Sequence, residues 1–194
     1  MRHERTIILL TLVLLSTASL HTQSRTPPGK QAPVKGFRSE FLWLLKDTEE
    51  KFFALAQAFP EELYGWRPMN GVRSPSEVFV HVAVSSYTIP AAAGVKSPLG
   101  NVRDLEKTMT AKAKVIEFLK DSFAHLRKAV VALRDQDLNK SAKVITEETT
   151  VRGVFFLTAT HMHEHLGQLI AYARENHIVP PWSALEENRG QKSR

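Results

Sequence analysis

The sequence predicts an all-α protein folded as a four-helix bundle. Apolar residues recur at three- and four-residue steps in four long segments, the pattern of helices with a buried face. Segments rich in proline and glycine separate these helices. The chain has 194 residues, of which 43% are hydrophobic, enough for one domain with a substantial core. Because it contains no cysteine, no disulfide supports that core, and any metal site must use histidine or carboxylate ligands.

Residues 1–23 have the composition of a secretory signal peptide. Arg2 and Arg5 precede an almost wholly apolar run over residues 6–15, and small residues follow at positions 16–19. We expect cleavage among these small residues or at the end of the segment. The protein would then be exported, periplasmic or secreted, with no membrane attachment. An uncleaved anchor is the alternative, but the apolar run is shorter than the roughly 20 residues that a membrane span needs.

Three further divisions follow along the chain. Residues 24–36 are rich in proline, glycine, serine and lysine and are typical of a flexible leader, and residues 184–194 are typical of a disordered tail. The bundle is predicted to occupy residues 37–183. Its first helix spans about residues 37–58 and ends before Pro60. The positions that define its buried face are Phe41, Leu44, Leu45, Thr48, Phe52, Leu55 and Phe59.

The second helix begins with a capping box. Ser74 can accept a hydrogen bond from the backbone N–H of Glu77, and Glu77 can reach back to the backbone of Ser74. Pro75 suits the first turn, and Pro90 disturbs the other end. The helix is therefore predicted to start at Ser74 and to continue to about Ile89.

The third and fourth helices are predicted over residues 105–133 and 150–176. The third has the most regular apolar pattern, which only Lys112 interrupts, and we predict one continuous helix. Between the two helices, residues 135–148 are polar and are predicted to form a connection, with at most a brief extended stretch and no strand of consequence. The positions of the apolar pattern in the third helix are Leu105, Met109, Ile116, Leu119, Phe123, Leu126, Val130 and Leu133.

Histidines on two of the predicted helices indicate a metal site. His161 and His165 are four residues apart, so their side chains point the same way, about one helical turn apart. This is the spacing with which two imidazoles bind one ion in HExxH metalloproteases. His81 is the natural third ligand, because it lies between Val78 and Val82 on the apolar side of the second helix. From the residues alone, a hydrogen-bonded core histidine explains such a position equally well.

Other residues near the three histidines give weaker indications of a role in the metal site. His163 is rotated by roughly 200° from His161 and should face away. Glu164 lies to one side of the pair and is at best an outer group that supports a ligand. No fourth protein ligand and no general base can be named. The polar side chains expected in the wall of the site are Ser85, Tyr87 and Gln168.

Two segments resemble the DinB-like superfamily, which contains metal-dependent enzymes and bacterial thiol transferases. They are GWRPMNGVRSPSEVFVHVA, over Gly65–Ala83, and the last-helix motif His161–Gln168 within HMHEHLGQLIAYARENHIVPPWS. The resemblance extends over residues 37–183. It implies a four-helix bundle of the DinB-like type, often a homodimer, in which His81, His161 and His165 bind one divalent ion: zinc or nickel, with iron as a further candidate. Many members have Arg-Gly-Gln at the end of the motif, whereas this chain has Leu166 in place of the arginine.

The resemblance leaves three kinds of function open. The first is a metal-dependent enzyme, a hydrolase or a thiol-linked transferase, acting on an unknown small molecule. The second is a non-catalytic metal- or ligand-binding bundle outside the cytoplasm, and the third is a bundle that has kept the fold without metal. No nucleic-acid partner is expected. The net charge is +6, but the basic residues are scattered among acids and form no run long enough to bind a phosphate backbone.

Overall fold

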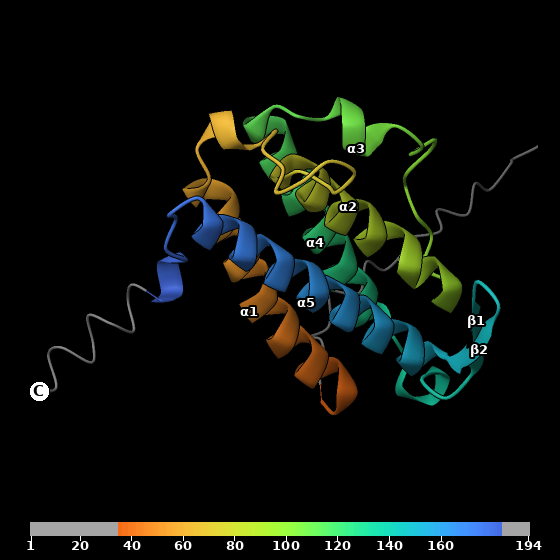
Figure 1. Ribbon diagram of the computed structural model, residues 1–194. Helices are drawn as coiled ribbons and strands as arrows, with labels where there is room; N and C mark the ends of the chain where they lie inside the picture. Colours follow the sequence, from red (N-terminus) through yellow and green to blue (C-terminus); the bar gives the residue numbers. More distant parts are fainter. Residues whose placement is uncertain (1–34, 184–194) are drawn as a thin grey trace, which may run out of the picture. The chain divides into compact units, whose positions relative to one another are not determined.

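The computed structural model describes residues 35–183, and the predicted signal peptide and C-terminal tail lie outside these residues, as does the leader except for its last two positions. Four long helices form the bundle, so the predicted all-α class is confirmed (Figure 1). Their bounds are α1 (Phe37–Ala58), α2 (Pro75–Thr88), α4 (Lys112–Ala132) and α5 (Val151–Glu175).

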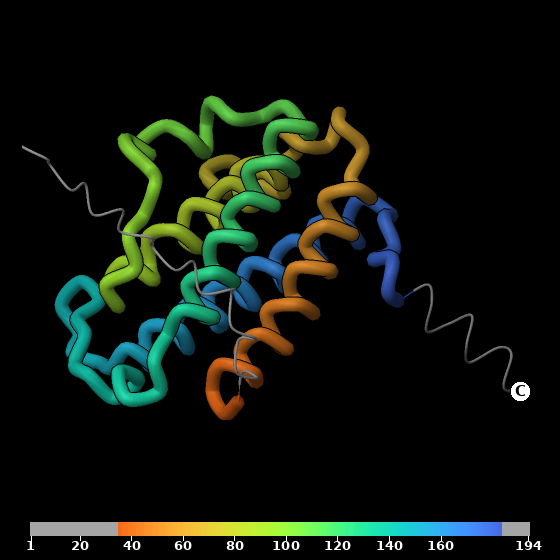
Figure 2. Tube along the Cα trace, turned by 180° about the vertical axis from the view of Figure 1, so that it is seen from behind, coloured from red at the N-terminus to blue at the C-terminus, as the bar shows by residue number. Residues whose placement is uncertain are grey.

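The four helices are arranged as two diagonal pairs. α5 lies against α1 and α2 in Figure 1, and α4 lies against the same two helices on the opposite side, as Figure 2 shows from behind. Shorter elements join them. These are α3 (Leu105–Thr108), the strands β1 (Ser141–Val144) and β2 (Glu147–Thr150), and 3-10 helices over Glu61–Leu63, Ile89–Ala93 and Asp135–Asp137.

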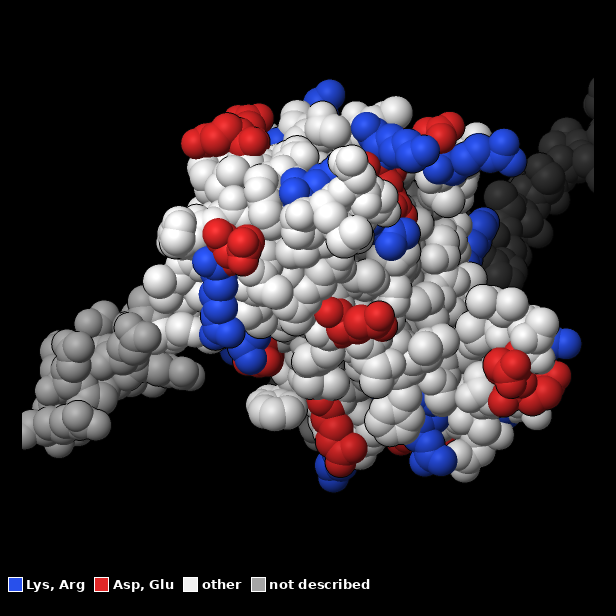
Figure 3. Space-filling model, in the orientation of Figure 1, with Lys and Arg blue, Asp and Glu red and all other residues white. Residues whose placement is uncertain are grey.

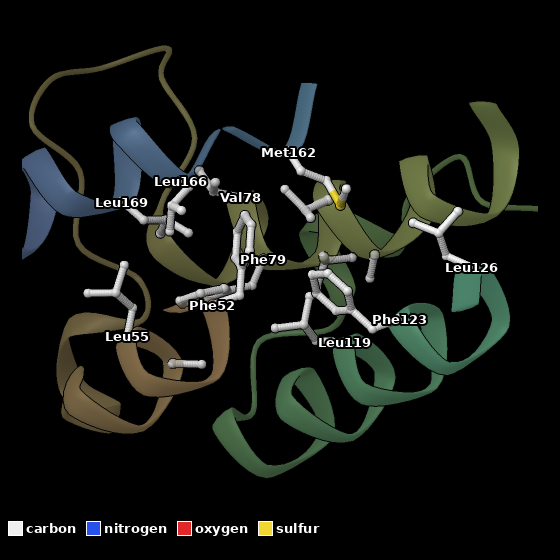
Figure 4. Packing of buried hydrophobic residues seen from close by; sticks show 14 of the residues in the cluster. Phe52, Leu55, Val78, Phe79, Leu119, Phe123, Leu126, Met162, Leu166 and Leu169 are labelled. Carbon is white, nitrogen blue, oxygen red and sulfur yellow. The ribbon is translucent and has the colours of Figure 1, made fainter. Parts of the chain in front are cut away.

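Side chains from all four long helices meet in one core. Phe52 of α1 lies between Phe79 of α2 and Phe123 of α4, with ring centroids 6.4 and 5.8 Å apart, and all three are fully buried. Met162 and Leu169 of α5 close the core from the remaining side (Figure 4). Burial of such large side chains contributes roughly 1.5–3 kcal/mol each, so packing alone can hold this cysteine-free fold.

The start of α2 has the predicted capping box. The backbone N–H of Glu77 donates to Oγ of Ser74 at 3.4 Å, and the backbone N–H of Ser74 donates to the Glu77 carboxylate at 2.9 Å. Pro75 occupies the first turn. The carboxylate of Glu77 is also paired with the guanidinium of Arg67, where the Nη2–Oε1 distance is 2.6 Å. This pair ties the loop before α2 to the first turn of that helix.

The prediction of one continuous third helix is wrong. The chain leaves the helical conformation at Met109 and re-enters it at Lys112, so that α3 is a separate turn beside α2. Lys112 explains the break, because its ammonium donates to the backbone carbonyls of Gln57 and Phe59, at 2.9 and 2.6 Å. A cation at the C-terminal end of α1 satisfies carbonyls that the helix itself leaves free.

The connection after α4 forms a hairpin, so the prediction that it lacks a strand of consequence is also wrong. β1 and β2 are antiparallel, with Ser141 opposite Thr150 and Val144 opposite Glu147. Thr150 then caps α5, since its hydroxyl accepts from the backbone N–H of Gly153 at 3.1 Å. β-branched residues on both strands favour this extended structure. The hairpin is small and leaves the fold class unchanged.

α5 has a buried face and a face at the margin of the core. Phe155, Met162 and Leu169 are buried, whereas Leu157, about one turn before His161, is 41% exposed. The histidine-bearing face therefore borders the core and also reaches the surface. No helix between residues 35 and 183 is long and apolar enough to cross a membrane.

Candidate metal centre

The structure brings the three predicted histidines together where α2 and α5 pack against each other. His81 comes from α2, and His161 and His165 come from successive turns of α5. One ring nitrogen from each residue lies within 4.8 Å of the others. The ring centroids are 5.0 Å apart for His81 and His161, 4.7 Å for His81 and His165, and 4.6 Å for His161 and His165. The three rings therefore form a nearly equilateral cluster.

Glu106 fixes the orientation of His81. Nδ1 of His81 donates a 2.7 Å hydrogen bond to Oε1 of Glu106, and Nε of Arg73 donates to the other oxygen at 2.7 Å. Because a carboxylate only accepts, the proton of His81 resides on Nδ1, and Nε2 carries the lone pair. Burial raises the pKa of Glu106, but the hydrogen bonds from Arg73 and His81 outweigh this and leave it below its ordinary value. The residue is thus an anion that supports the histidine.

Gln168 fixes the orientation of His165. Nδ1 of His165 donates to Oε1 of Gln168 at 2.8 Å, because an amide oxygen only accepts. Nε2 of Gln168 in turn donates to the hydroxyl of Tyr172 at 2.7 Å. The ring of Tyr172 packs edge-on against Trp66, with centroids 5.5 Å apart. A chain of contacts thus connects the histidine to Trp66, which lies in the loop before α2 and packs partly buried against the core.

His161 is held by Ser85 of α2, whose Oγ lies 2.9 Å from Nε2 of the imidazole. Burial lowers the pKa of His161 to about 4, and repulsion from the two neighbouring imidazoles adds to this effect. Burial likewise lowers the pKa of His81, more than the hydrogen bond to Glu106 raises it. Both rings are therefore neutral near pH 7, the state in which an imidazole can donate a lone pair to a metal.

The family model of the DinB superfamily matches residues 44–169, a segment that contains all three histidines. The chain belongs to the DinB superfamily. No protein of curated function shows significant sequence similarity to it.

Two solved DinB-like proteins have a similar fold. A DinB-like protein from Bacillus cereus ATCC 10987 superposes with a TM-score of 0.66 and 16% identity, covering 74% of this chain and 95% of its own. A DinB-like protein from Bacillus subtilis has a TM-score of 0.56 and 21% identity, covering 74% of this chain and 92% of its own. At these identities the likeness establishes the DinB-like fold and says nothing about activity.

Other residues considered from the sequence lie outside the cluster in this DinB-superfamily chain. His163 is exposed and donates through Nδ1 to the backbone carbonyl of Ala159 at 2.9 Å, as its rotation on the helix predicts. The expected wall residue Tyr87 instead packs against His125 of α4, with ring centroids 4.8 Å apart. Glu164 is exposed, and its charge acts on His161 by raising the pKa of that histidine, against the larger effect of burial.

Sequence reasoning missed Glu106 and Arg73. Glu106 lies on α3, which was predicted as the first turn of one long helix, and that prediction gave no reason to place it beside α2. Arg73 lies in the loop before α2, within the segment Gly65–Ala83, but nothing in that segment predicts a contact with Glu106. The one available signal was Lys112, whose polar side chain interrupts the apolar pattern where the helix breaks.

Proposed function

We propose that the protein is a metal-dependent enzyme whose His81, His161 and His165 hold one divalent ion. The observation that carries this proposal is the mutual approach of three ring nitrogens to within 4.8 Å, two of them on rings with a depressed pKa. Without an ion, the second ring nitrogens of His81 and His165 would need another partner, because Glu106 and Gln168 engage only Nδ1. Membership of the DinB superfamily supports the same assignment, because the family resemblance implies a metal site at these three histidines.

The donor set suits zinc, nickel or iron. Imidazole is a ligand common to all three, and the chain offers no thiolate that would select a softer ion. The outer contacts to Glu106 and Gln168 resemble those that orient metal-binding histidines in general, because each accepts the proton of the nitrogen not used for the metal. We place zinc and nickel ahead of iron on the family resemblance.

Three protein ligands are typical of catalytic rather than structural sites. An ion bound there would supply Lewis acidity toward a carbonyl, a water or a thiol. The chain's own residues hold the rings, keep two of them neutral and place the cluster at the edge of the core, where a small molecule can reach it. Hydrolysis and transfer to a thiol are the two reactions that this arrangement supports.

Cobalt substitution tests the proposal. Apo protein titrated with cobalt(II) should reach one equivalent and develop the intense visible absorption of a four- or five-coordinate site. Adding azide or a small thiol should change that spectrum, because a three-histidine site leaves a position for an exogenous ligand. Failure to bind cobalt, or a stoichiometry that His161→Ala leaves unchanged, would contradict the proposal. His163→Ala is the matched control, since His163 is on the same helix and outside the cluster.

A second function is a non-catalytic metal-binding bundle. The exposure of the histidine-bearing face of α5 speaks against a fully shielded ion, because Leu157 on that face is 41% exposed. The two functions differ in turnover. A catalytic site should hydrolyse model esters or amides, or consume an electrophile in the presence of a thiol, and His161→Ala should abolish either activity. Turnover that needs no thiol would exclude the transferase. The absence of turnover in both assays would favour the non-catalytic bundle.

We also infer that the protein is exported. The support is in residues 1–23, where two arginines, an apolar run and small residues follow one another in the order of a signal peptide. Expression of the full chain with a C-terminal tag, followed by fractionation and intact-mass measurement, tests this inference. Recovery outside the cytoplasm with the first 18 to 23 residues removed is the expected result. An intact N-terminus in the cytoplasmic fraction would contradict it.

A further inference from the structure

A cavity of about 690 Å³ adjoins the three-histidine cluster, between α3, the loop before α2 and the C-terminal half of α5. Its wall contains Glu106 and Gln168, the two residues that accept hydrogen bonds from His81 and His165. The cavity therefore reaches the outer side of the cluster. The remaining residues of its lining are Arg67, Gly71, Val72, Arg73, Glu77, Arg103 and Lys107.

Two of the four cations in this lining are already neutralised. Arg67 is paired with Glu77, and Arg73 is paired with Glu106 at 2.7 Å. These two carboxylates are the only acids of the lining. The paired groups bind the loop before α2 to α2 itself and to α3, so they build the wall of the cavity.

Arg103 and Lys107 remain as uncompensated charges. Within residues 35–183, no carboxylate lies within ion-pair distance of either side chain. The lining thus carries a formal charge of +2, from four cations and two anions. Figure 3 shows Lys and Arg side chains gathered over α3 and the segment before α2. A concave site with an excess of one charge attracts small ions of the opposite sign.

We propose that this cavity binds an anionic group of the substrate, a carboxylate or a phosphate, through Arg103 and Lys107. The proposal rests on the proposed function in one respect, because it places the reacting part of that substrate at the three-histidine cluster. The anion-binding step depends on the cavity alone. A guanidinium can bind both oxygens of a carboxylate or phosphate, and an ammonium adds a second charge-assisted hydrogen bond.

The test measures binding of two probe anions, inorganic phosphate and succinate, by isothermal titration calorimetry with the full chain. It uses protein as purified and after dialysis against a chelator, so that direct binding of a probe to metal is recognised. The variant is Arg103→Gln combined with Lys107→Gln. The matched control is Lys114→Gln combined with Lys128→Gln, which removes the same two charges from exposed positions of α4.

Saturable binding of at least one probe to the chelator-treated wild type is expected, and the probe that binds more tightly identifies the anionic group. The cavity variant should bind it about tenfold or more weakly, because it loses the charge-assisted hydrogen bonds of both side chains. The control should bind as the wild type does. Equal binding in variant and control, or no binding of either probe, would overturn the proposal.

Metal content separates this proposal from the proposed function. The Arg103→Gln, Lys107→Gln variant should retain the metal of the wild type, because neither residue contacts a histidine of the cluster. If the wild type holds no metal as purified and takes up none on titration, but still binds a probe anion, the cavity assignment stands and the metalloenzyme is contradicted. Metal binding without anion binding would support the metalloenzyme and contradict the cavity assignment.

Discussion

Nδ1 of His81 donates to Oε1 of Glu106 at 2.7 Å, although the two residues are 25 positions apart and lie on different helices. The hydrogen bond fixes the tautomer of the histidine, and Arg73 holds the carboxylate from its other side at 2.7 Å. A metal-binding histidine supported in this way is a better ligand, because its ring is oriented and its free nitrogen is more basic. Glu106 is therefore the outer residue with the largest expected effect on metal affinity.

Glu106→Ala should weaken metal binding roughly 10- to 100-fold, the usual effect of removing such an outer partner. Competition with a chromophoric chelator measures the affinity for zinc and for nickel. Glu164→Ala is the control, because Glu164 is an exposed carboxylate next to the cluster in sequence. If the two variants have the same affinity as the wild type, Glu106 has no supporting role.

Gln168→Leu should also reduce metal affinity, because it removes the acceptor of the His165 Nδ1 proton. We expect the metal affinity to fall about tenfold, which is the lower end of the range for outer partners, because water can replace an amide at the margin of the core. Tyr172→Phe removes only the next hydrogen bond of the chain and should have a smaller effect. The same chelator competition ranks the two variants, and a larger loss in Tyr172→Phe would contradict the order.

The carboxylate of Glu77 makes the stability of the folded protein depend on pH in the acid range. The hydrogen bond from Arg67 lowers the pKa of Glu77 below its ordinary value of 4.5, despite the opposing effect of burial. Below about pH 4.5 the unfolded chain therefore binds more protons than the folded one, and the stabilisation from this carboxylate is lost as the pH falls. At pH 7, Glu77→Gln should lower the melting temperature by about 2–4 °C, as expected for a loss of roughly 1 kcal/mol.

Thermal unfolding of wild type and Glu77→Gln at a series of pH values checks this. The difference between their melting temperatures should be largest above pH 5 and should shrink as the pH falls below 4.5. A difference that stays constant down to pH 3 would show that the charge of Glu77 is not responsible.

The family resemblance predicts a homodimer, and we expect it on the exposed aromatic surface of α1 and α5. Trp43 is 74% exposed and Phe156 is 56% exposed, and the ring of Phe37 lies 5.5 Å from that of Phe156. Sedimentation velocity should show a dimer for the wild type and a monomer for Trp43→Arg combined with Phe156→Arg. Ile145→Arg, at a hairpin position that is 92% exposed, is the control. A monomeric wild type, or a dimer that survives the double substitution, would contradict the prediction.

The helices were predictable from the sequence because each carries its own apolar pattern. α1 spans the 22 predicted residues, and the capping box at Ser74 and Glu77 places the start of α2. The pattern failed between Leu105 and Lys112, since apolar spacing can continue across a break in the backbone. What decides that break is a contact of Lys112 with the end of α1, a long-range contact that local periodicity does not contain.

The same distinction applies to the site. His161 and His165 share a helix, so their common direction follows from spacing, and His81 needed only an inward position on another helix. The proximity of all three in the structure agrees with that inference, while metal binding itself stays a prediction. Glu106 could not be predicted, because its place depends on α3 being separate. The position of the cluster at the margin of the core, shown by exposed Leu157, also depends on how α5 is rotated against α2.

The most direct test of the account is the metal content of the purified protein. Elemental analysis of the wild type should find about one divalent ion per chain, and His81→Ala, His161→Ala and His165→Ala should each lose most of it. His163→Ala, with its histidine in the same helix but outside the cluster, should keep it. Full occupancy in any of the three cluster variants, or equal loss in all four, would contradict a site built from His81, His161 and His165.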